Sequence, residues 1–237
     1  MPRPDGRSPR AMRPVRLEAG VSPYAEGSAL CSFGQTQVLC TASLESRVPS
    51  FLEGRGQGWV TAEYAMLPRA THTRTSRDHA QGGRAREISR LIGRSLRGAV
   101  DLARLEGYTV RVDCDVLVAD GGTRTAAVSG GYVALALALA GLGVTPLYQV
   151  AALSVGRVGG ELAVDLCYQE DSQAQVDLNL VLAPPDRLIE VQATAEKGYF
   201  TPAQLAEMVA AAGEATQAVF AAQSAILDRA SQGAGSK

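Results

Sequence analysis

Two adjacent glycines followed by a threonine and an arginine mark the first place where this sequence could bind an anion. These residues, Gly121, Gly122, Thr123 and Arg124, lie between a stretch typical of a β-strand and an apolar stretch typical of a helix. Glycine lets backbone amides approach a ligand closely, and a helix N-terminus presents free N–H groups and a positive dipole end. The segment therefore predicts a site for inorganic phosphate or a phosphate ester, although an ordinary strand-to-helix turn could contain the same residues. It is not a Walker A loop, because no Gly-Lys-Ser/Thr sequence follows.

Two aspartates, Asp171 and Asp177, form a second candidate site. An extended segment would place both on one face, because side chains alternate along a strand, and a turn between them could also bring them together. Paired carboxylates suit Mg²⁺, which prefers oxygen ligands and commonly binds substrate phosphate as well; one of them could instead act as a general acid. Solvated acids at a strand edge are the alternative. Asp113 and Asp115, which alternate out of an apolar strand, could serve either role less specifically.

Positive charge is concentrated in residues 69–104, although the 237-residue chain has a formal net charge of only −1. The segment contains nine arginines and three acidic residues, a local charge of +6. A near-neutral chain with one basic segment indicates a local anionic partner, and the guanidinium group binds phosphate through two hydrogen bonds. GC-rich codon usage could explain why the chain has 21 arginines and two lysines, but not why the arginines cluster. The nine are Arg69, Arg74, Arg77, Arg84, Arg86, Arg90, Arg94, Arg97 and Arg104.

Other classes of protein and site are disfavoured by what the sequence contains. Residues 1–16 are rich in proline and arginine without an apolar core, and the apolar run 133–144 is shorter than the roughly 18 residues of a membrane span. We therefore expect a cytoplasmic protein without membrane contacts. The four cysteines form no C-x-x-C pair and are expected to be buried, reduced thiols. His72 and His79 have no neighbouring cysteine, which makes a zinc site improbable.

The apolar patterning predicts one mixed α/β (α+β) domain over residues 1–230, followed by a flexible tail at 231–237. A polar loop is expected at 68–83, between a strand and a helix with an arginine-rich outer face. Strands are predicted at 16–20, 27–33, 36–42, 59–67, 108–119, 150–155, 162–168, 176–182 and 188–193. Helices are predicted at 85–105, 125–142 and 202–227.

The sequence also resembles the ribonuclease PH family, the phosphate-dependent exoribonucleases of tRNA 3′ ends, over nearly the whole chain. Three residues, Ala85, Ala193 and Lys197, depart from the family's usual pattern without touching a matched functional position. The matching segments are 5–7, 13–15, 27–28, 48–52, 58–64, 66–71, 87–88, 90–97, 113–116, 119–125, 170–172, 177 and 190–192.

The resemblance implies a ribonuclease PH-type domain related to the second domain of ribosomal protein S5, assembled as a homohexamer, a trimer of dimers. It implies a Mg²⁺-dependent reaction in which inorganic phosphate attacks the terminal phosphodiester of tRNA precursors and other structured RNA 3′ ends, releasing a nucleoside diphosphate. The implied phosphate-binding residues are Arg84, Gly122, Thr123 and Arg124. The implied catalytic and metal-binding residues are Asp171 and Asp177, and those for RNA are Arg69, Arg74, Arg77 and Arg90. A non-catalytic RNA-binding ring subunit of an exosome-like assembly is the alternative.

Overall fold

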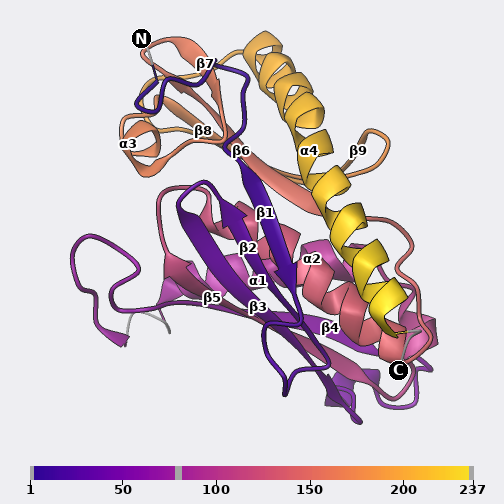
Figure 1. Cartoon of the computed structure of the whole chain (residues 1–237). Helices are drawn as coiled ribbons and strands as arrows, with labels where there is room; N and C mark the ends of the chain where they lie inside the picture. Colours follow the sequence, from indigo (N-terminus) through magenta and orange to yellow (C-terminus); the bar gives the residue numbers. More distant parts are fainter. Residues whose placement is uncertain (1–2, 78–81, 235–237) are drawn as a thin grey trace.

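The computed structural model describes residues 3–77 and 82–234 and contains two β-sheets packed around a central helix (Figure 1). The first sheet has five strands in the order β1-β2-β3-β5-β4, and only the β4–β5 pair is parallel. Its strands are β1 (Val15–Ala19), β2 (Gly27–Phe33), β3 (Thr36–Glu45), β4 (Trp59–Met66) and β5 (Thr109–Val118).

Strand β5 shows why the first sheet forms where the sequence predicts it. Its residues Val110, Val112, Cys114 and Val116 are buried, because they alternate onto the face covered by the helices. Val118 of the same strand is instead 39% exposed. It lies at the end of the strand, where the β3–β5 register shifts between positions 37 and 38, so the regular alternation stops there.

The second sheet has four antiparallel strands in the order β7-β6-β8-β9. They are β6 (Ala151–Val158), β7 (Glu161–Val164), β8 (Val176–Ala183) and β9 (Arg187–Ala195). The strand predicted at 162–168 ends at Val164, and the chain then forms the short helix α3 (Tyr168–Asp171). A local capping box explains this difference, because the Glu170 carboxylate accepts a hydrogen bond from the Cys167 amide at 3.0 Å.

Helix α2 (Thr123–Gly141) is buried on nearly all sides and contacts strands of both sheets. Glycine lets it lie close to the first sheet: a Cβ atom at Gly130 would be 2.7 Å from the Cβ of Cys31 and 3.0 Å from the Sγ of Cys40. All four cysteines are free and buried, as expected. By length and composition α2 alone, among the described helices, would be long and apolar enough to cross a membrane, and most of it is covered by the surrounding protein.

The other two long helices differ from their predicted lengths. Helix α1 (Gly83–Gly98) ends seven residues early, and a separate 3₁₀ helix, η3 (Leu102–Leu105), follows because the Asp101 side chain accepts a hydrogen bond from the Ala103 amide. Helix α4 (Pro202–Ala234) extends beyond position 227, so residues 231–234 of the predicted tail have helical backbone. Residues 235–237 lie outside the described part of the chain. A further 3₁₀ helix, η1 (Ser50–Leu52), precedes β4.

One large apolar core joins the two sheets, and its members come from both sheets and from α1, α2 and α4. Helix α1 contributes Ile88, Leu91, Ile92 and Leu96, while α4 lies along β1, β6 and α2 (Figure 1). This shared core fixes the start of α1 and the start of α2 relative to the edge of the second sheet, where the candidate site lies.

Candidate active site

The predicted phosphate-binding and acidic residues meet in one recess. A cavity of about 810 Å³ lies between the start of α1, the start of α2, helix α3 and strands β8 and β9. An adjoining cavity of about 210 Å³ shares residues with it and reaches the glycine turn before α2. The six predicted residues that line this recess are Arg84, Gly122, Thr123, Arg124, Asp171 and Asp177.

The glycine turn has a backbone that other residues would strain. Gly121 and Gly122 have φ values of 74° and 66°, in the left-handed region that favours glycine. A Cβ atom at Gly121 would also lie only 2.4 Å from the Leu166 carbonyl oxygen, so the turn packs directly against the segment that leads into α3. The Thr123 hydroxyl lies 2.7 Å from that of Tyr64 on β4.

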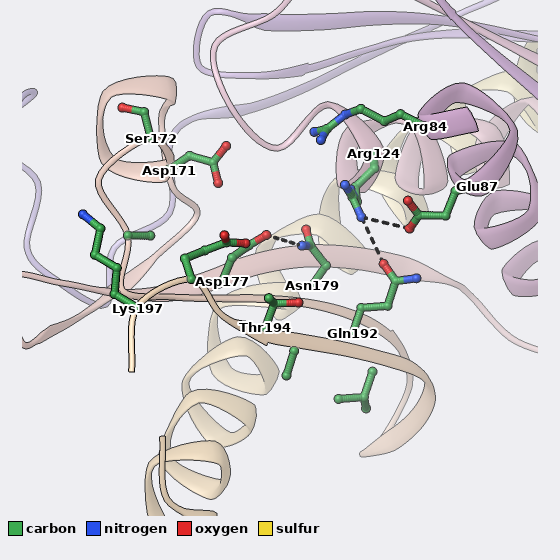
Figure 2. Close-up of a pocket in the computed structure, with 14 residues that line it drawn as sticks. Arg84, Glu87, Arg124, Asp171, Ser172, Asp177, Asn179, Gln192, Thr194 and Lys197 are labelled. Atoms are coloured by element: carbon green, nitrogen blue, oxygen red, sulfur yellow. Dashed lines mark hydrogen bonds and ion pairs between the residues drawn. The ribbon is translucent and has the colours of Figure 1, made fainter. Parts of the chain in front are cut away.

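Arg84 and Arg124 come from two different helices and face the same recess (Figure 2). Arg124 is held by two neighbours: its Nη1 donates to Gln192 Oε1 on β9 at 3.0 Å and lies 3.7 Å from Glu87 Oε1 on α1. The arrangement places one fixed guanidinium group and one solvent-exposed guanidinium group beside the glycine turn, which suits recognition of a small oxyanion.

Asp171 and Asp177 lie opposite the two arginines (Figure 2). Asp171 ends α3 and Asp177 is the second residue of β8, so a turn brings them together and the extended alternative is wrong. Asn179 donates to Asp177 Oδ2 at 3.0 Å, whereas the buried Oδ1 has no hydrogen-bond partner among the described residues. Burial, reinforced by the charge of Asp171, raises the pKa of Asp177 to about 6, with Arg124 acting in the opposite direction. Burial also raises the pKa of Asp171.

The four arginines expected to contact RNA do not line this recess. Arg69, Arg74 and Arg77 are exposed on the segment between β4 and α1, and Arg90 is exposed on α1. Part of the predicted basic helix face is paired within the chain, because Arg94 forms an ion pair with Glu190 on β9. The predicted polar loop contains residues 78–81, including His79, which lie outside the described residues.

Some residues that build the site were not identified from the sequence. Glu87, Asn179 and Gln192 hold or flank the charged groups, and Tyr64 contacts Thr123. A signal for Asn179 was present, since it follows Asp177 by two positions in an apolar strand and must share its face. Gln192 pairs with Asn179 across the β8–β9 ladder, a relation that only the register of the two strands shows.

Sequence comparison defines the class of protein to which this fold and site belong. Residues 11–140 match the 3′ exoribonuclease family, domain 1, and residues 148–215 match domain 2 of the same family. The chain belongs to this family, the RNase PH family of 3′ exoribonucleases. The first match contains the five-stranded sheet and the second contains the four-stranded sheet. The family and the mixed α/β fold expected from the sequence are therefore confirmed.

Solved structures with the same fold include subunits of exosomes. Rice (Oryza sativa) Rrp46 is 20% identical, with a TM-score of 0.74 over 93% of this chain and 100% of Rrp46. A chain of the Archaeoglobus fulgidus exosome with RNA bound to the active site is 23% identical, with a TM-score of 0.79 over 91% of this chain and 90% of that one. A chain of an archaeal exosome core is 22% identical, with a TM-score of 0.75 over 90% and 87% of the two chains. At these identities the likeness shows the fold.

Proposed function

We propose that this protein is a phosphorolytic 3′-to-5′ exoribonuclease that trims the 3′ ends of tRNA precursors and other structured RNAs. The proposal depends on one observation above all: two arginines, a glycine turn and a carboxylate pair, contributed by four separate elements, line a single recess. In the reaction, an oxygen of inorganic phosphate attacks the phosphorus of the terminal phosphodiester. The bond from phosphorus to the 3′ oxygen of the preceding nucleotide breaks, that oxygen gains a proton, and a nucleoside diphosphate leaves.

The attacking phosphate would bind at the end of the recess formed by α1 and α2. Arg84 and Arg124 supply fork-shaped N–H donors, and the turn before α2 supplies backbone amides. Phosphoryl transfer is accelerated mainly by positioning and by stabilisation of charge. The contacts of Arg124 to Gln192 and Glu87 fix its guanidinium group before phosphate arrives.

The carboxylate pair suits a magnesium ion. Asp177 Oδ1 is a buried oxygen without a hydrogen-bond partner among the described residues, and Mg²⁺ usually binds through one or two carboxylates together with substrate phosphates. Asp171 and Asp177 would hold the ion, which would supply positive charge to the reacting phosphate group. One of the two carboxyls could instead protonate the leaving 3′ oxygen, a role consistent with the raised pKa of both.

The rest of the RNA would contact the basic segment outside the recess. Exposed Arg69, Arg74, Arg77 and Arg90 support this part of the proposal, as does the local charge of +6 in residues 69–104. Such contacts to phosphates position an RNA without reading its bases. We place this activity in the cytoplasm and in a homohexamer built as a trimer of dimers, as the resemblance to the ribonuclease PH family implies.

An assay of released nucleotides tests the proposal. RNA with a tRNA-like 3′ extension is incubated with the protein and Mg²⁺, with and without inorganic phosphate, and the products are identified by mass spectrometry. We expect nucleoside diphosphates only when phosphate is present, and none from the double variant Asp171→Asn, Asp177→Asn. The matched control is Asp186→Asn, which removes an exposed aspartate from the β8–β9 turn. Release of nucleoside monophosphates without phosphate would contradict the proposal.

A second candidate function is a non-catalytic RNA-binding subunit of an exosome-like ring. The observation that favours it is that two of the solved structures described above are chains of archaeal exosomes. Against it, this chain has a complete set of paired arginines and carboxylates around its recess. The same assay separates the two functions, because a non-catalytic subunit would bind the RNA and release no nucleoside diphosphate.

A further inference from the structure

Residues 3–13 form an arginine-rich N-terminal segment. This segment contacts the chain between the end of β7 and the end of α3, which leads into the candidate site. The segment runs beside β7 and α3, as Figure 1 shows. Arg3 donates to both Glu170 carboxylate oxygens, at 2.6 and 2.8 Å, and Arg13 donates to both Asp165 oxygens, at 2.8 and 2.7 Å. All four side chains are buried, with Asp165 at 0% exposure. Buried ion pairs of this kind add little net stability when compared with apolar packing, so their presence needs another explanation.

Arg13 also reaches the glycine turn beside the recess. Its Nη1 donates to the Asp120 carbonyl oxygen and its Nη2 to that of Gly121, the latter at 3.3 Å. The hydroxyl of Thr36, a fully buried residue at the start of β3, donates to the same Gly121 oxygen at 2.7 Å and accepts from the Asp120 amide at 3.0 Å. Two buried side chains therefore fix the orientation of two consecutive peptide groups.

The orientation of these carbonyls determines where the next amides point. In a trans peptide the C=O and N–H bonds point in opposite directions. With the carbonyls of Asp120 and Gly121 held on the side of Arg13 and Thr36, the amides of Gly121 and Gly122 are directed to the opposite side of the turn. Both glycines line the cavity shared with Arg124 and Asp177.

We propose that Arg13 and Thr36 are positioning residues that aim the amides of the Gly121–Gly122 turn at the attacking phosphate. Glycine can rotate its peptide groups more freely than any other residue, so a glycine turn needs such restraint to stay ready for an anion. Asp165 completes the arrangement, since it fixes Arg13 through three hydrogen bonds, two from the guanidinium and one from the Arg13 amide at 2.9 Å. The inference rests on the proposed function, because it takes inorganic phosphate to be the ligand.

The test replaces Thr36 with valine, which removes the hydroxyl and keeps the shape of the side chain. We expect Thr36→Val to weaken the binding of inorganic phosphate about five- to tenfold, as measured by calorimetry with phosphate alone, and to raise the KM for phosphate equally. The KM for RNA should not change. Thr36→Ser, which keeps the hydroxyl, should restore both values. The matched control is Thr109→Val, because Thr109 is also buried and its hydroxyl makes a similar hydrogen bond, to the Arg47 carbonyl, at the far end of the sheet.

Arg13→Lys provides a second variant in case Thr36→Val does not fold. It keeps a positive charge for Asp165 but lacks the fork that reaches both carbonyls, and the same reduction of phosphate affinity is expected. Unchanged phosphate affinity in folded Thr36→Val or Arg13→Lys would overturn the inference, as would an equal reduction in Thr109→Val. The outcome is separate from that of the proposed function: a wild-type protein that binds phosphate but releases no nucleoside diphosphate would contradict only the function.

Discussion

At the residue scale, the burial of Asp177 in the candidate site lowers the stability of the folded protein when this carboxyl group is ionised. Its pKa is about 6 in the folded protein against an ordinary value of 3.8, chiefly because the carboxyl is buried. The folded state therefore binds this proton more tightly than the unfolded state does. The free energy of unfolding must fall as pH rises from about 4 to about 6 and then stay lower, because the buried group has to ionise.

Asp177→Asn removes this buried charge and keeps the volume of the side chain. In the absence of Mg²⁺ we expect the variant to be more stable than the wild type by about 1–3 kcal/mol above pH 6, with the difference vanishing near pH 4. Urea unfolding with EDTA at pH 7.5 and pH 4 measures it, and Asp186→Asn serves as the exposed control. A difference of equal size at both pH values would show that burial of charge is not its cause.

Arg124→Ala should reduce turnover by orders of magnitude and weaken phosphate binding, because it removes the fixed guanidinium group of the recess. RNA binding should be largely intact, since the basic segment is unchanged. Gln192→Leu removes the group that accepts from Arg124, together with the hydrogen bond from Gln192 to Glu190 at 3.3 Å, and leaves the Arg124 guanidinium group in place, so a smaller rise in the KM for phosphate is expected. Steady-state kinetics at varied phosphate and varied RNA separates these effects. Near-normal phosphorolysis by Arg124→Ala at modest phosphate concentrations would contradict the assignment.

At the scale of single elements, the segment between β4 and α1 should bind RNA away from the reacting bond. Replacing Arg69, Arg74 and Arg77 with alanine should weaken tRNA binding and flatten its dependence on salt. Removing one arginine–phosphate interaction reduces the slope of log affinity against log salt by somewhat less than one unit. The affinity for tRNA, measured at several salt concentrations from about 50 to about 300 mM, checks this slope. Phosphorolysis of a short oligonucleotide should change much less.

The control for this triple variant replaces three exposed arginines elsewhere, Arg47, Arg55 and Arg229. Exposed arginines are also enriched at protein interfaces, so the triple variant must be sized by light scattering. If it separates into dimers and loses activity on the short oligonucleotide as well, these arginines hold the assembly together and the RNA-binding interpretation is wrong.

An element of this fold can be predicted from the sequence when neighbouring residues determine its structure. It cannot be predicted in this way when residues distant in the sequence determine it. Strand β5 follows from its own alternation of valines and cysteine with polar residues. Helix α3 could not be predicted in the same way, because four residues carry too little periodicity and Glu170 is fixed by Arg3, 167 positions away. The same holds in the site: the glycine turn and the carboxylates are recognisable as residue types, whereas Gln192 and Thr36 are placed by strand register and by packing.

At the scale of the whole molecule, the shared core predicts that both sheets unfold together. Helix α2 contacts strands of each sheet, so neither sheet can keep its apolar face covered once the other unfolds. Trp59, the single tryptophan, reports on the first sheet, while far-ultraviolet circular dichroism reports on the whole chain. We expect the two signals to show one coincident transition in urea. Two separated transitions would show that the two matched family domains are independent units.

The ion pairs of the N-terminal segment also determine at which point of its synthesis the chain can complete the candidate site. Arg13 is made 152 residues before its partner Asp165. Until that partner emerges from the ribosome, Arg13 lacks the carboxylate that fixes its guanidinium group beside the glycine turn. Folds rich in contacts of such long sequence separation form slowly. Under the proposed function, a nascent chain exposes residues 69–104 to RNA before Asp171 and Asp177 have been made, so cleavage begins only after the second sheet has formed.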